Sequence, residues 1–218
     1  MGSYLNPGNF SFRGSLRSKI YVDKSKLIAR TNEALCTEQK YICVSRPRRF
    51  GKSMAANMLA AYYDRSEHTD ELFENLKISK DQSYRENLNR YDVIKINIQE
   101  FLSMTGTVEE MLEMLKNYLI SDFKEAYPKI HLRDEKNLIQ VMKDVFSYTK
   151  CPFVILIDEW DCLFREYKQD KEEQKKYLDF LRAWLKDKDY VALAYMTGIL
   201  PIKKYGSHSA LNMFTEYS

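Results

Sequence analysis

The sequence predicts an α/β fold in which helices cover both faces of a mostly parallel β-sheet. The first observation behind this prediction is that short apolar segments rich in β-forming residues alternate with amphipathic helical segments along the 218 residues. Strands separated by helices favour parallel pairing through right-handed crossovers. The second observation is that residues 153–157 (FVILI) are five consecutive apolar residues, which suits a central strand buried on both faces.

We expect four strands and the start of a fifth. Residues 40–46 (KYICVSR) form a short apolar run, and residues 91–98 (YDVIKINI) alternate in the manner of a strand. The apolar run inside residues 152–161 gives the third strand, and residues 190–198 (YVALAYMTG) give the fourth. The terminal residues 212–218 (NMFTEYS) can begin the fifth.

Helices are expected between these strands because apolar side chains recur there at helical spacing. Residues 51–64 and 174–187 are rich in helix formers. Thr107 and Glu110 are spaced as a capping box, in which each side chain bonds the other residue's backbone N–H, so they mark the start of a further helix. The apolar stripes are Met54, Met58 and Tyr62; Val108, Met111, Leu112, Leu115 and Leu119; Leu138, Val141, Met142, Val145 and Phe146; and Leu178, Leu181, Trp184 and Leu185.

Composition narrows the class of protein. A hydrophobic content of 44% and a charged content of 30% are ordinary for a globular domain, and a net charge of +3 neither requires nor excludes nucleic acid. No apolar run approaches the roughly 20 residues that cross a bilayer, and the first ten residues lack a signal-peptide pattern. The 4 cysteines form no C-x-x-C pair. We therefore expect a cytoplasmic protein with reduced thiols and no membrane partner.

Residues 46–53 (RPRRFGKS) end in the G-K-[ST] triplet of a phosphate-binding loop. They follow a predicted strand and open a predicted helix, whose unpaired N–H groups and positive dipole end attract anions. Gly51 would let the backbone approach a phosphate, because glycine has no Cβ. Lys52 would reach the β- and γ-phosphates, and the Ser53 hydroxyl would bind Mg²⁺.

Arg46 stands where the G-x-x-x-x-G-K-[ST] pattern has its first glycine. Pro47 favours an extended conformation at Arg46 and has no N–H to offer a phosphate. Taken alone, the segment therefore also fits a second hypothesis. It would be a basic turn that is solvated at the surface or that binds nucleic-acid phosphates through Arg46, Arg48 and Arg49.

Two adjacent acids, Asp158 and Glu159, follow the apolar third strand. If that strand neighbours the loop strand, the acids lie beside the loop, because ligands of such sheets bind at the carboxyl ends of the strands. Asp158 would then hold Mg²⁺ through water, opposite Ser53. Glu159 would accept a proton from the water that attacks the γ-phosphate. This combination favours a nucleotide site over an ordinary polar turn.

Thr197 is a polar residue at the end of the apolar fourth strand. If the fourth strand lies between the loop strand and the acid-bearing strand, the Thr197 hydroxyl could orient the attacking water near the γ-phosphate. The alternative is an ordinary threonine at a strand end.

Six motifs lie in order along the chain, namely YVDKSKLI (21–28), RPRRFGKS (46–53), LFENLKI (72–78), ILIDEWD (155–161), TGILPI (197–202) and SALNMF (209–214). Together they resemble the AAA-ATPase-like family of bacterial proteins, and the resemblance covers nearly the whole chain. It implies a three-layer P-loop NTPase sandwich of the class that has an additional strand between the loop strand and the acid-bearing strand, with a catalytic Glu as the second acid. The family tolerates arginine in place of the first loop glycine.

The residues and the resemblance together give the expected site. ATP and Mg²⁺ are the expected ligands, with Ser53 and Asp158 on the metal. The expected catalytic residues are Glu159, Lys52 and Thr197. Asp23 matches the family's first motif, and capping of a helix is its alternative role. The residues expected to contact ATP are Asp23, Arg48, Arg49, Phe50, Gly51, Lys52, Ser53 and Met54.

Other residues have open roles at this point. Asp161 belongs to the family's acidic motif without an assigned task, and Asn212 resembles a family asparagine that is a candidate nucleotide sensor. Arg48 and Arg49 are candidates for contact with the γ-phosphate, a neighbouring subunit or nucleic acid. Arg165 and Arg182 are candidate arginine fingers, although charges exposed on helices are the commoner case.

We expect residues 1–30 to lead into the nucleotide site and residues 31–218 to form the P-loop ATPase core, truncated near the fifth strand. Family members often carry a C-terminal PD-(D/E)XK nuclease-like domain, and we expect no nuclease activity from this chain. The expected function is Mg²⁺-dependent binding and hydrolysis of ATP, with a homo-oligomer or a C-terminal domain as candidate partners. The alternatives are an ATP-binding switch with negligible hydrolysis, and a nucleic-acid-binding module that uses the arginine-rich loop.

Overall fold

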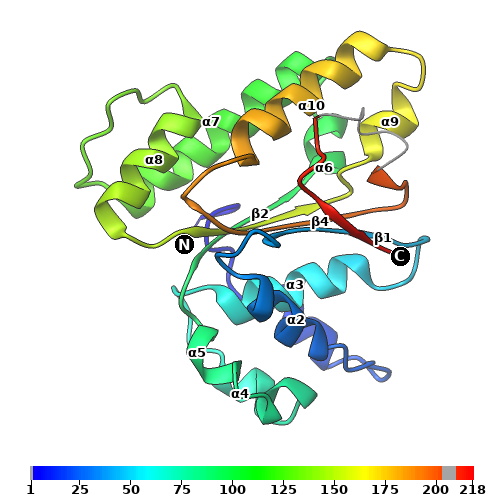
Figure 1. The fold of residues 1–218 in the computed structure, drawn as a ribbon, viewed down its shortest axis with the longest axis vertical. Coiled ribbons are helices and arrows are strands. Elements are labelled where there is room, and N and C mark those ends of the chain that lie inside the picture. The colour runs from blue at the N-terminus through cyan, green and yellow to red at the C-terminus, as the bar shows by residue number, and fades with distance from the viewer. Residues whose placement is uncertain (1, 203–209) are drawn as a thin grey trace.

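A five-stranded parallel sheet forms the centre of the protein in the computed structural model, which describes residues 2–202 and 210–218 (Figure 1). The strands lie in the order β2-β3-β4-β1-β5, and every neighbouring pair is parallel. The sheet confirms the predicted α/β class with its additional strand, because β4 lies between β1 and β3. The strands are β1 (Tyr41–Ser45), β2 (Asp92–Asn97), β3 (Phe153–Asp158), β4 (Val191–Gly198) and β5 (Thr215–Tyr217).

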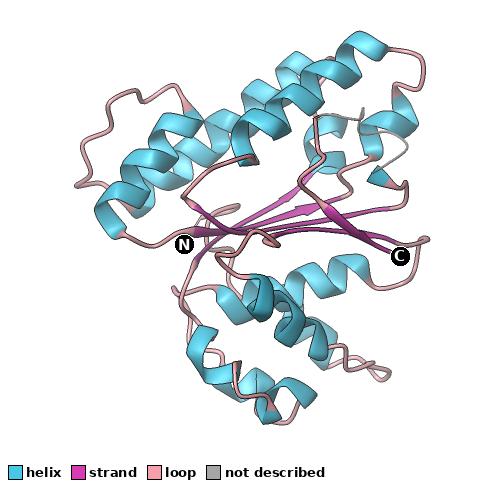
Figure 2. Ribbon diagram, viewed as in Figure 1, coloured by secondary structure: helices cyan, strands magenta, loops and turns pink. Residues whose placement is uncertain are grey.

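Helices cover both faces of the sheet, which makes three layers (Figure 2). On one face, the upper one in Figure 1, the longer helices α7, α8 and α10 pack against the side chains that β2, β3 and β4 direct to that face. Short helices join this layer to the carboxyl ends of the strands. The helices of this face are α6 (Ile98–Ser103), α7 (Val108–Ala126), α8 (Leu138–Thr149), α9 (Cys162–Glu166) and α10 (Lys171–Leu185).

The opposite face is covered by helices from the first half of the chain. The helix α3 packs against β2, β3 and β4, and α1 packs against α3. A second cluster of buried side chains fills this layer and includes Tyr62, Tyr63 and Phe73, which are fully buried. The helices of this face are α1 (Phe10–Leu16), α2 (Lys26–Ala34), α3 (Lys52–Tyr63), α4 (Asp70–Phe73), the 3₁₀ helix η1 (Lys77–Lys80) and α5 (Tyr84–Asn87).

The capping box predicted from Thr107 and Glu110 is present at the start of α7. The Thr107 side chain accepts a hydrogen bond from the Glu110 N–H at 3.2 Å, and the Glu110 carboxylate accepts one from the Thr107 N–H at 3.2 Å. A different cap shortens the second strand from its predicted end. The Asn97 side chain accepts a hydrogen bond from the Gln99 N–H, so α6 begins at Ile98, where a strand residue was expected.

The N-terminal residues cover one edge of the sheet. Leu5 forms an antiparallel bridge with Ile94 of β2. On either side of it, the Lys95 N–H donates to the Tyr4 carbonyl at 2.8 Å and the Asn6 N–H donates to the Val93 carbonyl at 2.7 Å. Because these contacts satisfy backbone groups that an edge strand would otherwise expose, β2 has no open edge along these residues.

The predicted division of the chain after residue 30 can be compared with the helices. The boundary expected after residue 30 falls inside α2, so the chain is helical across that point.

None of the helices in residues 2–202 and 210–218 combines the length and the apolar character that crossing a membrane requires.

Candidate nucleotide-binding site

The segments that follow β1, β3 and β4 meet at one edge of the sheet. The register pairs Ser45 at the end of β1 with Gly198 at the end of β4, and Met196 of β4 with Ile157 of β3. The Arg46 N–H then donates to the Gly198 carbonyl at 3.0 Å. This arrangement places the 46–53 loop beside the two acids, as the predicted strand order requires.

The lysine of the loop is turned back onto the loop itself. The Lys52 ammonium donates to the carbonyls of Arg46 at 2.9 Å and Pro47 at 3.0 Å, and only 8% of the residue is exposed. Gly51 caps α3 with φ 75° and ψ 28°, a left-handed conformation that glycine adopts without strain. These two carbonyls therefore give the charge of the buried Lys52 its hydrogen-bond partners.

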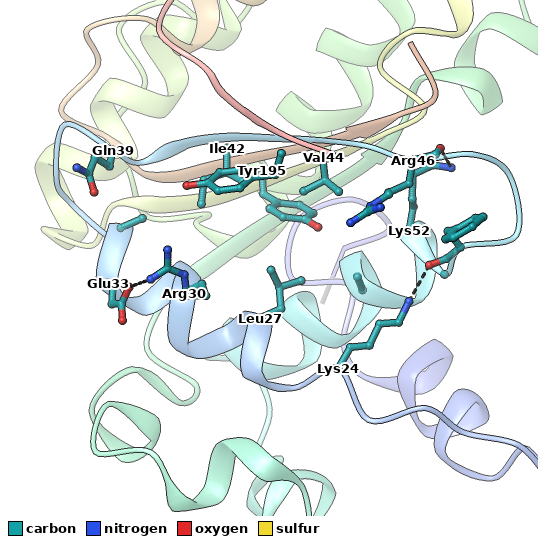
Figure 3. Close-up of a pocket in the computed structure, with 15 residues that line it drawn as sticks. Lys24, Leu27, Arg30, Glu33, Gln39, Ile42, Val44, Arg46, Lys52 and Tyr195 are labelled. Carbon is teal, nitrogen blue, oxygen red and sulfur yellow. Dashed lines mark hydrogen bonds and ion pairs between the residues drawn. The ribbon is translucent and has the colours of Figure 1, made fainter. Parts of the chain in front are cut away.

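A lysine from the N-terminal segment also contacts the loop. The Lys24 ammonium donates to the Phe50 carbonyl at 2.8 Å, and it would lie 3.3 Å from a Cβ at Gly51 (Figure 3). Both expected ligand residues at the tip, Arg48 and Arg49, are exposed, and Arg49 has φ 70°. Lys24, just before α2, and the arginines at the tip of the loop therefore add positive charge to that of Lys52.

A cavity of about 560 Å³ opens beside the loop, between α2 and the sheet. Its walls are apolar in the middle, where Leu27 faces β1 and Tyr195 (Figure 3). Several cations lie at the end near the loop, whereas at the other end the cation Arg30 is paired with Glu33 beside Gln39, so the two ends of the cavity differ in charge. Its lining includes Lys24, Arg46 and Lys52 at the loop end, Leu27, Ala34, Ile42, Val44 and Tyr195 along the walls, and Arg30, Glu33 and Gln39 at the far end.

Asp158 is buried at the end of β3 and has one free oxygen. Its Oδ1 accepts hydrogen bonds from the Thr197 hydroxyl and from the Glu159 N–H at 3.0 Å. Within the described part of the chain, no hydrogen bond ends on Oδ2 of this carboxylate. The Thr197 hydroxyl, expected to orient a water, is thus engaged in fixing Asp158, and Thr197 is fully buried.

The Glu159 side chain pairs with an arginine. The Glu159 backbone has φ 53°, an uncommon value for a residue with a side chain. The chain turns at this residue, and the next N–H, that of Trp160, donates to the Thr197 carbonyl at 3.1 Å. The Glu159 carboxylate forms an ion pair with Arg165 of α9. Arg165, a candidate arginine finger, therefore contacts a carboxylate of its own chain, whereas Arg182 lies in the last turn of α10.

Asp161 has a clear structural role that the sequence did not assign. Its carboxylate is fully buried, and Oδ2 accepts hydrogen bonds from the N–H groups of Ile199 at 3.0 Å and Leu200 at 2.8 Å. Gly198 packs directly against it, because a Cβ at Gly198 would lie 2.7 Å from the Asp161 carboxylate and 2.6 Å from the Trp160 indole nitrogen. Asp161 thus fixes the exit of β4 beside the two acids.

Asp23, an expected ligand residue, and Asn212, a candidate nucleotide sensor, both have partners within the chain. The Asp23 carboxylate accepts hydrogen bonds from the N–H groups of Ser25 and Lys77, each at 2.8 Å, whereas Ser25 is the N-cap of α2 and no side chain caps that helix. Burial would raise the pKa of Asp23, but these hydrogen bonds outweigh it and hold the pKa below its ordinary value. Asn212 accepts a hydrogen bond from the Lys186 ammonium at 3.3 Å. The start of the 209–214 motif lies outside the described residues.

Two other titratable groups shape the electrostatics of the site. Burial lowers the pKa of Lys95 on β2, although Asp158 and Glu100 act in the opposite direction. Lys95 therefore places a positive group within electrostatic reach of Asp158. Burial raises the pKa of Tyr195, so its phenol stays protonated at the wall of the cavity.

The comparison with protein families identifies the chain. The family model described as "Predicted AAA-ATPase" matches residues 12–207 of the 218. The chain belongs to the AAA-ATPase-like family. No curated protein matches this AAA-ATPase-like chain. The family match and the parallel sheet together support an ATP-binding P-loop domain.

The cavity of this AAA-ATPase-like chain includes residues that sequence reasoning missed. Ile42 and Val44 lie two apart on β1, so the alternation of a strand could have placed both on one face. For Tyr195 no such signal exists, because β4 is apolar and buried along its whole length. Leu27 could have been found only by recognising α2, whose start is fixed by Asp23 from outside the helix.

Proposed function

We propose that the chain binds Mg²⁺·ATP and hydrolyses the bond to the γ-phosphate. The observation that carries this proposal is the meeting of three features at one sheet edge: Lys52 across the 46–53 loop, the adjacent cavity, and the pair Asp158 and Glu159. Each feature alone has another explanation. Together they supply a phosphate cradle, a volume for a nucleoside and a pair of carboxylates.

The triphosphate would bind on the 46–53 loop. Lys52 would exchange the carbonyls of Arg46 and Pro47 for phosphate oxygens, so that its charged donor meets charged acceptors in place of neutral ones. The first N–H groups of α3 point toward the same place and carry partial positive charge. The exposed Arg48 and Arg49, with Phe50 and Met54, would close around the phosphates from the tip and the helix.

The nucleoside would occupy the cavity beside the loop. A volume of about 560 Å³ falls inside the range of roughly 300–1,000 Å³ typical of small-molecule sites. The apolar walls suit the faces of a base, and the polar groups of Glu33 and Gln39 at the far end suit its edge. The cations at the loop end then lie on the side where the phosphates belong.

The free oxygens near the loop fit a magnesium ion. Asp158 Oδ2 and the exposed Ser53 hydroxyl have no hydrogen-bond partner in the described part of the chain, and both are the hard oxygen ligands that Mg²⁺ prefers. Asp158 would act through a bound water and Ser53 directly. When bound, the ion neutralises charge on the β- and γ-phosphates.

Glu159 would act as the general base, and other groups would position it. Its carboxylate would accept a proton from the attacking water, which requires that it face the γ-phosphate. Thr197 would keep Asp158 in place through the hydrogen bond to Oδ1. Lys52 would stabilise the charge that develops on the phosphate oxygens in the transition state.

One observation favours the switch alternative. Glu159 is paired with Arg165 in this structure, and a base held in this way supports binding without rapid turnover. A nucleic-acid-binding module would instead show DNA affinity that falls steeply with salt and is unaffected by ATP. Residues 1–30 would contribute Lys24 and the start of α2 to the nucleotide site, with the core following.

Lys52→Ala tests the phosphate-loop assignment. Loss of a charge-assisted contact worth about 1.5–3 kcal/mol should weaken ATP binding by roughly tenfold or more. The measurement is a titration with a fluorescent ATP analogue. Lys175→Ala is the matched control, because Lys175 is exposed on α10, outside the residues that line the cavity. Equal affinity in the parent and the Lys52 variant would contradict the assignment.

A further inference from the structure

Arg165 lies between two carboxylates at the end of β3. Its Nη2 forms the ion pair with Oε2 of Glu159. Its Nε lies 3.6 Å from Oδ2 of Asp161, which is too long for a hydrogen bond. Arg165 therefore forms a close ion pair with Glu159 and only a longer, incomplete contact with Asp161.

Each member of the incomplete contact has a buried polar atom without a hydrogen bond. Among the described residues, three buried side-chain atoms find no hydrogen-bond partner, namely Asp161 Oδ1, Arg165 Nε and the indole Nε1 of Trp160. Buried polar groups without partners are rare because they are costly. If Nε and Nη2 of Arg165 both donated to the two oxygens of Asp161, Nε and Oδ1 would gain partners, and Trp160 Nε1 would stay as it is.

A closed contact with Asp161 would compete with Glu159. The side-on fork of a guanidinium uses Nε and Nη2 together, and Nη2 is the nitrogen now bound to Glu159. Asp161 is already held through Oδ2 by the backbone of Ile199 and Leu200, so the arginine is the partner that would move. The two arrangements of Arg165 exclude each other.

We propose that Arg165 is a positioning residue for Glu159, which it releases by transferring its guanidinium to Asp161. The inference rests on the proposed function, because it takes Glu159 as the base. In the arrangement seen here, the ion pair fixes the Glu159 carboxylate. With Arg165 on Asp161, Glu159 turns to the attacking water. Because Asp161 also binds Ile199 and Leu200, the exchange links the base to the segment that follows β4.

Three variants test this exchange through kcat and KM for Mg²⁺·ATP, with thermal unfolding measured for each. Arg165→Ala should raise kcat by on the order of fivefold, with KM unchanged, because removing a partly exposed ion pair raises the fraction of free Glu159. Asp161→Asn should lower kcat, because Arg165 loses its second carboxylate. Asn keeps an oxygen for the backbone of Ile199 and Leu200. Arg165→Lys keeps the charge without the fork, so it should also lower kcat.

The double variant Asp161→Asn, Arg165→Ala gives the decisive comparison. If Asp161 acts through Arg165, the double variant should turn over ATP at least as fast as the parent. A double variant as slow as Asp161→Asn alone would overturn the exchange. An Arg165→Ala variant that turns over ATP no faster than the parent would also overturn it, whether the parent is active or inert. If Asp161→Asn does not fold, the opposite shifts of Arg165→Ala and Arg165→Lys decide. Arg17→Ala, an exposed arginine at the end of α1, is the matched control.

Glu159→Gln separates this inference from the proposed function. If that variant turns over ATP as fast as the parent, Glu159 is not the base and the proposed function fails. If Glu159→Gln is slow but Arg165→Ala and Arg165→Lys both match the parent, the proposed function stands and only the exchange is wrong.

Discussion

Asp158 and Glu159 are adjacent in the sequence, but their side chains have different environments. Asp158 is 5% exposed and accepts a hydrogen bond from the Thr197 hydroxyl, whereas Glu159 is partly exposed and pairs with Arg165. A buried carboxylate with one fixed oxygen suits metal binding, and a carboxylate that can exchange partners suits proton transfer. The left-handed backbone at Glu159 produces this separation.

Glu159→Gln should separate ATP binding from hydrolysis. The amide keeps the size of the side chain but cannot take a proton, so ATP should still bind while turnover falls by ~10²–10⁴. The measurement combines nucleotide titration with phosphate release at saturating Mg²⁺. An arginine supplied by a neighbouring subunit can be worth ~10³–10⁵ in rate, so protein concentration should be varied. Unchanged turnover would show that another group is the base.

Gly198→Ala should damage the site through packing alone. A methyl group at Gly198 would lie 2.6 Å from the Trp160 indole nitrogen and 2.7 Å from the Asp161 carboxylate. Overpacking of this kind costs about 1–3 kcal/mol of unfolding free energy, and displacing Asp161 should also slow ATP turnover. Urea unfolding and phosphate release measure the two effects.

Gly14→Ala is the control for this substitution. Gly14 lies in α1, and a Cβ there meets nothing within 4 Å. Because alanine is the better helix former, this variant should be neutral or more stable by about 0.5–1 kcal/mol. Equal losses of stability at both glycines would contradict the packing argument.

Sequence reasoning predicted where the candidate site residues lie but did not describe their contacts. The spacing of Lys52, Asp158 and Thr197 after apolar strands places them at one sheet edge, as the structure shows. The hydrogen bond from Thr197 to Asp158 joins residues 39 apart, and Asp161 binds backbone groups 38 and 39 residues away. Such contacts depend on the register between β3 and β4, which residue types do not specify.

Among the elements, strands and long helices were predictable and short helices were not. The helices α7, α8 and α10 span several turns, so their apolar stripes repeat often enough to be recognised. The helices α4, α5 and α9 have 4 or 5 residues, too few for a periodic pattern. The position of β4 between β1 and β3 was predicted correctly because the resemblance implied an additional strand there.

Asp144→Asn should change how the stability of the α8 region depends on pH. The Asp144 carboxylate accepts hydrogen bonds from the Arg133 N–H at 2.8 Å, the Arg133 Nε at 2.7 Å and Gln140 at 2.8 Å. Burial would raise its pKa, but these contacts outweigh it, so the pKa lies below its ordinary value. Because the folded pKa is depressed, its stabilisation is present above the unfolded pKa of about 4 and is lost as pH falls through the folded pKa.

Urea unfolding of the parent and the Asp144 variant at pH 7 and near pH 3 checks this prediction. The variant should be less stable at pH 7, and the difference between the two proteins should shrink on acidification. Asp179→Asn, at an exposed position of α10, is the control. A difference that stays constant with pH would show that the carboxylate charge at Asp144 is not what stabilises the region.

At the scale of the whole molecule, ATP should stabilise the fold. A ligand that binds only the native state adds about 2.7 kcal/mol at 100 times its Kd, which for a domain of this size is about 5–10 °C in Tm. Because Ser53 and Asp158 are proposed to hold Mg²⁺, a chelator should reduce the shift, and Ser53→Ala should reduce its dependence on Mg²⁺. An equal shift with and without chelator would contradict the proposed metal site.

The strand order also determines when the proposed nucleotide site can form during synthesis. Within the described residues, β1 pairs only with β4 and β5, which leave the ribosome about 150 and 170 residues after it. The strands β2 and β3 can pair with each other earlier, and the N-terminal residues can join them. The strand that carries the phosphate loop therefore waits longest for a neighbour. A nascent chain that stops before residue 191 would contain the complete 46–53 sequence and still lack the sheet edge on which we propose that a nucleotide binds.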